Sequence, residues 1–313
     1  MSHPDAVERD DATVDERDPG RESLVTIACA QFEPRVGDLE GNREKSCEFI
    51  SDAAEQGADF IVLPELANSG YVFNSREEAR SLAEPIPEGQ TAQRWIDLAE
   101  EHDAYIVGGY SEQDGDRLYN SSILVGPDGY IGTHRKVHLW NEEKLWFEPG
   151  DDVEVFETKI GRIGMQICYD QWFPELTRIQ AGKGADIIAE PTNWVPINDY
   201  EQSGQMDEDE LARANYLAVS NAHVNTVWFA CADRVGTERG QPFLGRSLVV
   251  DPAGNPIAGP ASQEDEELLL VEDCNLMDAR KMKTWTDHNV IPRDRRTDLY
   301  DELCGYEDDP HAF

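Results

Sequence analysis

Basic residues, and lysine above all, are scarce in this sequence of 313 residues. Lys and Arg together number 27 against 64 Asp and Glu, and only seven of the 27 are lysine, so the formal net charge is −37. A nucleic-acid-binding protein needs a basic footprint, and this charge excludes that class. No hydrophobic run approaches the roughly 20 residues of a membrane span, so we expect no membrane-spanning helix.

Cysteine pairs with the spacing of a metal site are also missing. The six cysteines include no CxxC pair, and no group of Cys and His has zinc-site spacing. We therefore expect free thiols, no metal and a reducing compartment. The polar, acidic segment 1–20 does not resemble a secretion signal, which also favours a cytoplasmic protein.

The acidity itself needs an explanation, because 39% of the residues are hydrophobic and the chain is too apolar to be a disordered acidic polymer. A folded surface of one charge sign stays soluble where salt screens its self-repulsion. Since the acidic excess runs along the whole chain and lysine is rare, we expect adaptation to a salty cytoplasm. An ordinary acidic protein with acidic tails is the alternative.

Extended and helical patterns alternate along the chain. Apolar runs bounded by turn residues predict buried strands, and apolar residues at helical spacing predict helices. The main predicted strands are residues 24–31, 59–64, 104–110, 118–125, 130–137, 160–167, 186–189, 226–232, 247–250 and 268–271. The main predicted helices are residues 41–56, 91–102, 174–182 and 209–221. The turn at 251–254 is predicted to join the last two strands.

The segments 57–64 (GADFIVLP) and 184–191 (GADIIAEP) resemble each other, and each follows a predicted helix. This weak repeat suggests two similar α/β halves around one core. We therefore expect a single α/β domain over residues 21–313. It would follow a disordered acidic tail at 1–20 and end in an irregular tail from about residue 289.

Cys168 stands where a predicted buried strand runs into a helix that begins near Pro174. A thiol at such a junction lies near helix amides, which would expose it, lower its pKa and suit it to nucleophilic attack. A structural core cysteine is the alternative and the commoner fate of a free thiol. A histidine base is also open, because strand alternation would put His134 and His138 on one face with Lys136.

Two other charged residues are candidates for the same chemistry. Glu65 ends a buried strand, where a carboxylate is costly without a reason, and it could serve as a general base. The alternative is that Glu65 caps a helix or is solvated and has no catalytic role. Lys136 could stabilise a developing oxyanion if its side chain points inward, and otherwise it is a solvated strand lysine. Glu143 could orient that lysine, although Glu142 competes for the role.

Three segments in chain order resemble the signatures of the nitrilase, or carbon–nitrogen hydrolase, superfamily. They are Pro64-Glu65, Arg135-Lys-Val-His138, and Ile167-Cys-Tyr-Asp170 with Phe173-Pro-Glu175. That family uses a Glu-Lys-Cys triad in this order, and three ordered motifs are far more specific than one. The resemblance implies a four-layer α-β-β-α sandwich without a cofactor. It also implies a homodimer or higher homo-oligomer, with the C-terminal tail reaching across to the partner.

The resemblance also implies roles for individual residues. Cys168 would be the nucleophile, Glu65 the general base and Lys136 the oxyanion stabiliser. Glu143 would be the family's additional glutamate, and the backbone N–H of Tyr169 would complete the oxyanion hole. The residues expected to line the substrate pocket are Tyr71, Trp172, Asn193 and Trp194.

The implied reaction is hydrolysis of a non-peptide C–N bond in a small amide or N-carbamoyl amine, through a thioester, with release of ammonia or an amine. Residues 168–175 look close to N-carbamoylputrescine amidases, whereas residues 232–240 look closer to archaeal nitrilase-like proteins. Nitrile hydrolysis is therefore the alternative reaction. A non-catalytic binding protein on the same fold is the alternative of another class.

Overall fold

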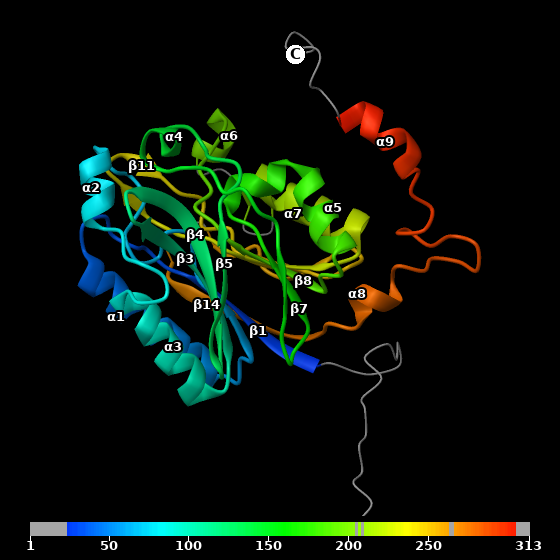
Figure 1. The fold of residues 1–313 in the computed structure, drawn as a ribbon, viewed down its shortest axis with the longest axis horizontal. Helices are drawn as coiled ribbons and strands as arrows, with labels where there is room; N and C mark the ends of the chain where they lie inside the picture. The colour runs from blue at the N-terminus through cyan, green and yellow to red at the C-terminus, as the bar shows by residue number, and fades with distance from the viewer. Residues whose placement is uncertain (1–23, 204–205, 208–209, 263–265, 305–313) are drawn as a thin grey trace, which may run out of the picture.

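The computed structural model describes residues 24–203, 206–207, 210–262 and 266–304. The acidic tail predicted at residues 1–20 lies outside the described residues. Two six-stranded sheets form the centre of the molecule (Figure 1).

The first sheet has the strand order β14-β1-β2-β3-β4-β5. Its strands β1, β2 and β3 are parallel, and antiparallel strands flank them on both sides. Their bounds are β1 Leu24–Gln31, β2 Phe60–Val62, β3 Tyr105–Asp114, β4 Arg117–Gly126, β5 Gly129–Arg135 and β14 Leu268–Asn275.

The second sheet has the order β13-β12-β9-β8-β7-β6 and repeats this plan. Its strands β7, β8 and β9 are parallel, again between antiparallel neighbours. Their bounds are β6 Val155–Glu157, β7 Arg162–Met165, β8 Ile187–Pro191, β9 Trp228–Ala232, β12 Leu248–Val250 and β13 Pro256–Ala258. The resemblance between 57–64 and 184–191 thus corresponds to β2 and β8, the middle parallel strands of the two sheets.

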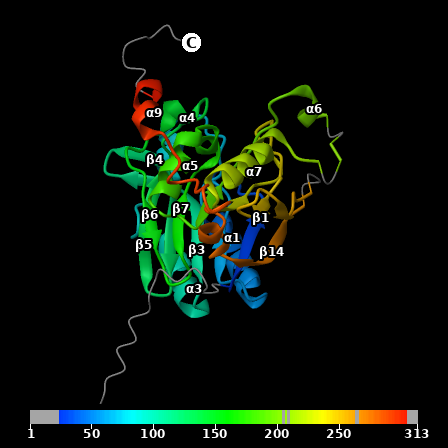
Figure 2. The ribbon, with the colours of Figure 1, turned by 90° about the vertical axis from the view of Figure 1, so that its right-hand side faces the viewer.

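Helices cover the outer face of each sheet. Helices α1 (Leu39–Glu55) and α3 (Gln90–His102) pack on the first sheet, and α5 (Pro174–Gly182) and α7 (Arg213–Asn225) pack on the second. Figure 1 shows the two helix pairs on opposite sides, and Figure 2 shows α5 and α7 side by side. The predicted four-layer α-β-β-α sandwich is confirmed.

The shorter elements lie in the connections. They are α2 (Arg76–Ser81), α4 (Glu143–Trp146), the 3-10 helix η1 (Cys168–Trp172), α6 (Asp199–Gln202), β10 (Thr237–Glu238), β11 (Gln241–Pro242), α8 (Asp278–Lys281) and α9 (Thr297–Cys304). Within the described ranges, none of the helices combines the length and the apolar character needed to cross a bilayer.

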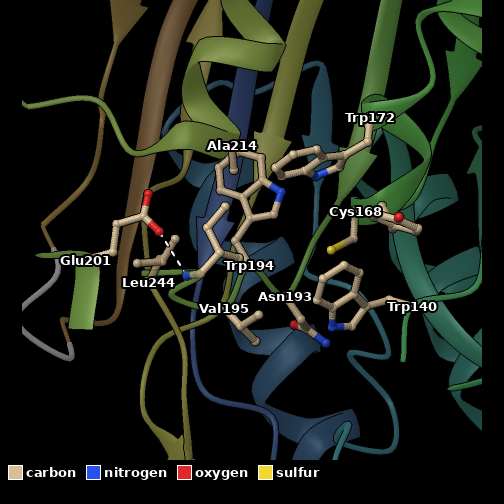
Figure 3. A pocket seen from close by; sticks show the side chains of 11 residues that line it. Trp140, Cys168, Trp172, Asn193, Trp194, Val195, Glu201, Ala214 and Leu244 are labelled. Carbon is tan, nitrogen blue, oxygen red and sulfur yellow. Dashed lines mark hydrogen bonds between the residues drawn. The ribbon is translucent and has the colours of Figure 1, made fainter. Parts of the chain in front are cut away.

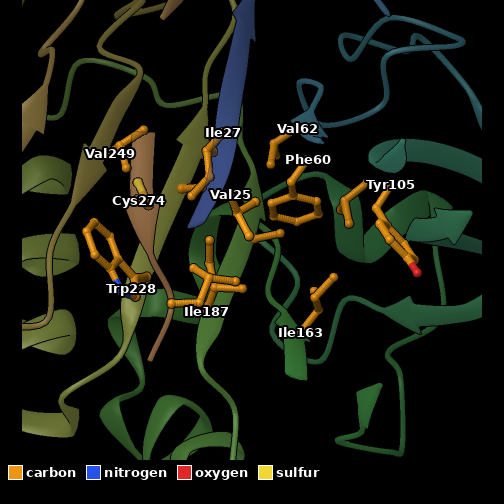
Figure 4. Packing of buried hydrophobic residues seen from close by; sticks show 14 of the residues in the cluster. Val25, Ile27, Phe60, Val62, Tyr105, Ile163, Ile187, Trp228, Val249 and Cys274 are labelled. Atoms are coloured by element: carbon orange, nitrogen blue, oxygen red, sulfur yellow. The ribbon is translucent and has the colours of Figure 1, made fainter. Parts of the chain in front are cut away.

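The core between the sheets follows from strand alternation, because successive side chains point to opposite faces of a sheet. On β1, Val25, Ile27 and Cys29 face the second sheet, whereas Ala28 and Ala30 pack toward the outer helices. Figure 4 shows this inter-sheet core, with side chains from both sheets interleaved. This core fixes the two sheets against each other at the ends where the site is built.

Two predictions about the C-terminal part were wrong. The turn at 251–254 leads into the short strand β13, and residues 268–275 instead pair with β1 in the other sheet. Three residues with a proline at their start carry too weak a pattern to be recognised as a strand. Residues Thr297–Cys304, expected to be irregular, form α9, with Asp298 in its favourable first turn. In Figure 1 the chain after α8 runs away from the sandwich toward α9.

Candidate active site

Three predicted site residues meet where strands of both sheets end. Glu65 follows β2, Lys136 follows β5 directly, and Cys168 follows β7 as the first residue of η1. Glu65 and Lys136 come from the first sheet and Cys168 from the second, so the sandwich itself brings the three together. Their distances in sequence therefore say little about their distances in space.

Glu65 and Lys136 form a fully buried ion pair. The Nζ atom of Lys136 donates to Oε1 of Glu65 at 2.7 Å, and Nδ2 of Asn120 donates to the same oxygen at 2.7 Å. The second oxygen of Glu65, Oε2, has no hydrogen-bond partner in the described part of the chain. This oxygen is therefore the one available to accept a proton.

Glu143 lies on the other side of the lysine. Its Oε1 accepts from Nζ of Lys136 at 2.8 Å and from the Tyr71 hydroxyl at 2.6 Å, and its Oε2 accepts from the Trp140 backbone N–H at 3.1 Å. Glu143 is buried, whereas its competitor Glu142 is exposed. The geometry thus places Glu143, and not Glu142, against the lysine.

The two carboxylates keep Lys136 charged. Burial alone lowers the pKa of Lys136, but the carboxylates of Glu143 and Glu65 outweigh burial and raise that pKa above its ordinary value. Burial also raises the pKa of the Glu143 carboxyl, while Lys136 opposes the rise. The result is a buried cation held between the carboxylates of Glu65 and Glu143.

Cys168 occupies a sharp turn, with a φ of 48° in the left-handed region that side-chain-bearing residues rarely adopt. The expectation of a lowered thiol pKa was wrong. Burial raises the pKa of the Cys168 thiol well above 9.0, Glu65 raises it further, and Lys136 only partly offsets them. The thiol is therefore neutral at rest and needs a base when it attacks.

The histidines near Lys136 do not supply that base. Strand β5 ends at Arg135, so strand alternation does not extend to His138. Both imidazoles instead contact the buried carboxylate of Asp170. His134 Nε2 lies 3.1 Å from Oδ2 and His138 Nδ1 lies 2.9 Å from Oδ1. This geometry does not support a Cys/His pair, and it gives Asp170 the task of tying η1 to the chain after β5.

An aromatic pocket opens over the thiol (Figure 3). It encloses about 420 Å³ of empty space, including its open mouth. The residues that line it are Trp140, Cys168, Tyr169, Trp172, Asn193, Trp194, Val195, Ile197, Glu201, Ala214 and Leu244. Four of these were predicted at the pocket or the oxyanion hole, namely Tyr169, Trp172, Asn193 and Trp194. Tyr71 is not among them, because its hydroxyl points to Glu143 instead.

Several residues of the site were not predicted from the sequence. Asn120 projects from the middle of β4, where two serines follow it, so its amide gives no distinct sequence signal. Trp140 and Glu201 lie in connections, where no periodicity identifies a pocket. Within the described ranges, no group of three or more His, Cys, Asp or Glu side chains is arranged to hold a metal ion.

Comparison with known proteins identifies the family of the chain. A family model described as carbon-nitrogen hydrolase matches residues 26–284. The chain is 40% identical to a nitrilase of Pyrococcus abyssi over 279 residues, which cover 88% of this chain and 99% of the relative. It is 33% identical to an N-carbamoylputrescine amidase of Solanum lycopersicum over 298 residues, or 90% and 95% of the two chains. A solved amidase structure from Nesterenkonia sp. matches with a TM-score of 0.70 at 26% identity, covering 90% of this chain and 97% of that one.

The chain belongs to the carbon–nitrogen hydrolase family. The resemblance drawn from the three ordered segments is thereby confirmed, as is the predicted class of activity, hydrolysis of a C–N bond by an enzyme. A non-catalytic binding role is not favoured. The matched region contains all three segments, so the converging residues of this carbon–nitrogen hydrolase belong to the family domain.

Proposed function

We propose that this carbon–nitrogen hydrolase cleaves small amides or N-carbamoyl amines with Cys168 as nucleophile, Glu65 as general base and Lys136 as oxyanion stabiliser. The observation that carries the proposal is the buried ion pair beside a neutral thiol. Lys136 occupies one oxygen of Glu65 at 2.7 Å, while the other oxygen has no described partner. The carboxylate can therefore stay bonded to the cation while it takes up the thiol proton.

The reaction follows from these positions. Glu65 removes the proton of Cys168 as sulfur attacks the carbonyl carbon, and Lys136 with the Tyr169 backbone N–H stabilises the negative oxygen. The C–N bond then breaks, and the nitrogen leaves as ammonia or an amine with the proton from Glu65. Water, deprotonated by Glu65, attacks the thioester carbon. The C–S bond breaks, the acid is released, and the proton returns to the thiol.

Asn193 supports an amide substrate over a nitrile. Its Nδ2 donates to the Glu65 backbone carbonyl at 3.0 Å, so its Oδ1 is an acceptor, and that buried atom has no described partner. An amide or carbamoyl group brings N–H donors to such an acceptor. A nitrile brings none and would leave the acceptor unpaired, which costs about 1–3 kcal/mol.

Glu201 supports a substrate with a positive tail. It is the one charged side chain among the described pocket residues, it is buried, and its oxygens accept backbone N–H groups of Ile197 and Arg213. No ion pair of Glu201 is found within the described ranges, so the described partners of its carboxylate are these two backbone N–H groups. A carboxylate in a pocket that is also lined by indole rings favours an ammonium group and disfavours a carboxylate.

The test is a panel of four substrates of similar length: an amine-terminated N-carbamoyl compound, a neutral alkyl amide, a carboxylate-terminated amide and an aliphatic dinitrile. We expect kcat/KM to fall in that order, and Cys168→Ala to abolish turnover of all four. Full activity in Cys168→Ala would refute the nucleophile. Fastest turnover of the dinitrile would refute the amide preference.

The role of Glu201 has its own variants. We expect Glu201→Gln to lower kcat/KM about 10-fold for the amine-terminated substrate and to leave the neutral amide unchanged, as for one charge contact at a partly desolvated site. Asp199→Asn, on the exposed side of the same helix, is the matched control and should change neither. An equal loss on all substrates would show that Glu201 only supports the loop.

We also propose a homodimer built on the outer face of α5 and α7. Large apolar side chains are exposed there, namely Ile179, Tyr216 and Val224, and Trp285 stacks near them on His223. Several large apolar side chains exposed on one helix pair support an interaction site there. The five described cysteines are free thiols, which supports a reducing, cytoplasmic location, and the net charge of −37 supports adaptation to high salt.

A further inference from the structure

The small hairpin β10–β11 lies outside both sheets, and its side chains form hydrogen bonds with the backbone of residues 71–72. Oε2 of Glu238 accepts the backbone N–H groups of Tyr71 at 2.8 Å and Val72 at 2.7 Å. Arg239 donates from Nη1 to the backbone carbonyl of Val72 at 2.8 Å. A negative group thus holds the N–H side of this segment and a positive group holds its C=O side.

Glu238 and Arg239, which together form a clamp on residues 71–72, are each held in place by further contacts. Oε1 of the buried Glu238 accepts the Val36 backbone N–H at 2.8 Å, and the buried guanidinium of Arg234 lies 3.4 Å from Oε2. Arg239 is paired with both oxygens of Glu78 at 2.7 Å. The three bonds to the loop each satisfy a different backbone group, and all three are charge-assisted, which makes them stronger than bonds between neutral groups.

The clamped segment carries a residue of the active site. The Tyr71 hydroxyl donates to Oε1 of Glu143 at 2.6 Å, and the same oxygen accepts from Nζ of Lys136 at 2.8 Å. The Tyr71 ring also meets the edge of Phe243 at 5.9 Å, with Arg234 stacked 4.1 Å above that ring. The position of the phenol therefore sets the position of the carboxylate oxygen that the lysine uses.

We propose that Glu238 is a positioning residue for the reaction, which acts through Tyr71 on Glu143 and thereby on Lys136. Arg239 supports the same positioning through its bond to the Val72 carbonyl. This inference rests on the proposed function, since it assigns Lys136 a role at the reacting atoms. The competing account is that Glu238 merely neutralises Arg234 and stabilises the loop, with no effect that passes through the phenol.

A double-mutant cycle separates the two accounts, because coupled residues give non-additive losses. Tyr71→Phe should lower kcat about 10-fold, the effect of one hydrogen bond to a charged group, with little change in KM. Glu238→Gln should lower kcat by a similar factor. In the Tyr71→Phe background, Glu238→Gln should cause no further loss. Multiplicative losses in the double variant would overturn the proposal.

A second variant guards against misfolding of Glu238→Gln. Arg239→Gln removes the contact that the exposed Arg239 makes with Val72, and it should lower kcat by a smaller factor that also vanishes in the Tyr71→Phe background. A loss that persists there would contradict the clamp. If Cys168→Ala is inactive while the cycle is additive, the inference fails and the proposed function stands.

The pH profile gives a readout that a merely structural role would not move. Lys136, Glu65 and Tyr71 face the Glu143 carboxyl, and the phenol and Lys136 both lower its pKa against the effect of burial. Loss of the phenol contact should therefore shift the acid limb of the kcat profile to higher pH in Tyr71→Phe, and in the same direction in Glu238→Gln. A Glu238→Gln profile with lower activity and an unshifted limb would overturn the proposal.

Discussion

At the scale of the residue, Cys168 is a neutral thiol at rest, which distinguishes this site from one whose cysteine is already a thiolate. Burial and the nearby Glu65 hold the proton on sulfur, and the cation of Lys136 only partly opposes them. Nucleophile and base are thus coupled, because the thiol becomes reactive only when Glu65 accepts its proton. This arrangement protects the thiol from adventitious oxidation, which follows thiolate character.

The protonation state can be measured from thiolate absorbance near 240 nm, taken as the difference between the native protein and Cys168→Ala. We expect no difference in absorbance at neutral pH. A difference should appear only above pH 9.0, which is the ordinary pKa of a cysteine thiol. Subtraction removes the other thiols, which the variant retains. A thiolate signal for Cys168 at pH 7 would contradict the account.

Glu142 and Glu143 lie next to each other at the start of α4, and only Glu143 is buried. Substitutions at the two positions therefore form a matched pair of variants. Glu143→Gln removes a carboxylate bonded to Lys136, and loss of one charge-assisted bond of about 1.5–3 kcal/mol should lower kcat about 10- to 100-fold. Glu142→Gln removes an equal charge one residue away on the exposed side and should leave kcat unchanged. Equal effects of the two changes would show that only net charge matters.

The residue types of the triad could be predicted from the sequence because three short motifs carry them. Among the partners of the triad, Glu143 could be predicted as well, but the others could not. Asn120, Tyr71 and Asp170 act through contacts across 55, 72 and 36 residues, and no local pattern encodes such distances. The thiol pKa was mispredicted for the same reason, since burial by distant segments outweighs the local turn.

At the scale of the element, Asp170 fixes the turn that carries the nucleophile. It accepts the backbone N–H groups of Ile167 and His138 and contacts both imidazoles, so it ties η1 to the chain after β5. Burial alone raises the pKa of the Asp170 carboxyl, but His134 and His138 outweigh it and hold that pKa well below the usual range.

Asp170→Asn should therefore lower the free energy of unfolding by about 2–3 kcal/mol at neutral pH, the value of hydrogen bonds to a charged group. The native carboxyl has a depressed pKa, so its stabilisation is present above the unfolded pKa near 4 and is lost as pH falls below it. Urea unfolding at pH 7 and pH 3 should show a large difference between variant and native protein at pH 7 and a smaller one at pH 3. A difference that grows toward pH 3 would contradict the assignment.

The long strands and helices were predicted well, because their apolar patterns span several turns or pleats. The strand Leu24–Gln31 and the helix Pro174–Gly182 have the bounds that the sequence predicted. Sheet membership could not be predicted, because β14 joins the sheet of β1 across more than 230 residues. Which strand β14 pairs with depends on how the whole core packs and not on the sequence of β14 alone.

At the scale of the whole molecule, the charge of −37 opposes compaction, and salt weakens that opposition. The Debye length falls from about 10 Å at 0.1 M to about 3 Å at 1 M. Glu65 and Lys136 are buried and Cys168 is partly buried, so the contacts of the triad are screened much less. Stability and catalysis should therefore respond differently to salt.

We expect Tm to rise markedly between 0.1 M and 2 M KCl, while kcat at 25 °C changes little wherever the protein stays folded. A non-ionic osmolyte at equal osmolality is the control and should raise Tm less than KCl does. An equal Tm in dilute buffer and molar KCl would refute the proposed adaptation to salt.

The central claim, that Cys168 carries the acyl group, is tested most directly by mass spectrometry of the quenched enzyme during turnover of a small amide. The account predicts one acyl group added to the peptide that contains Cys168, longer-lived in Glu65→Gln than in the native protein once formed, and absent in Cys168→Ala. Turnover with an acyl group on another residue, or undiminished turnover in Cys168→Ala, would contradict it.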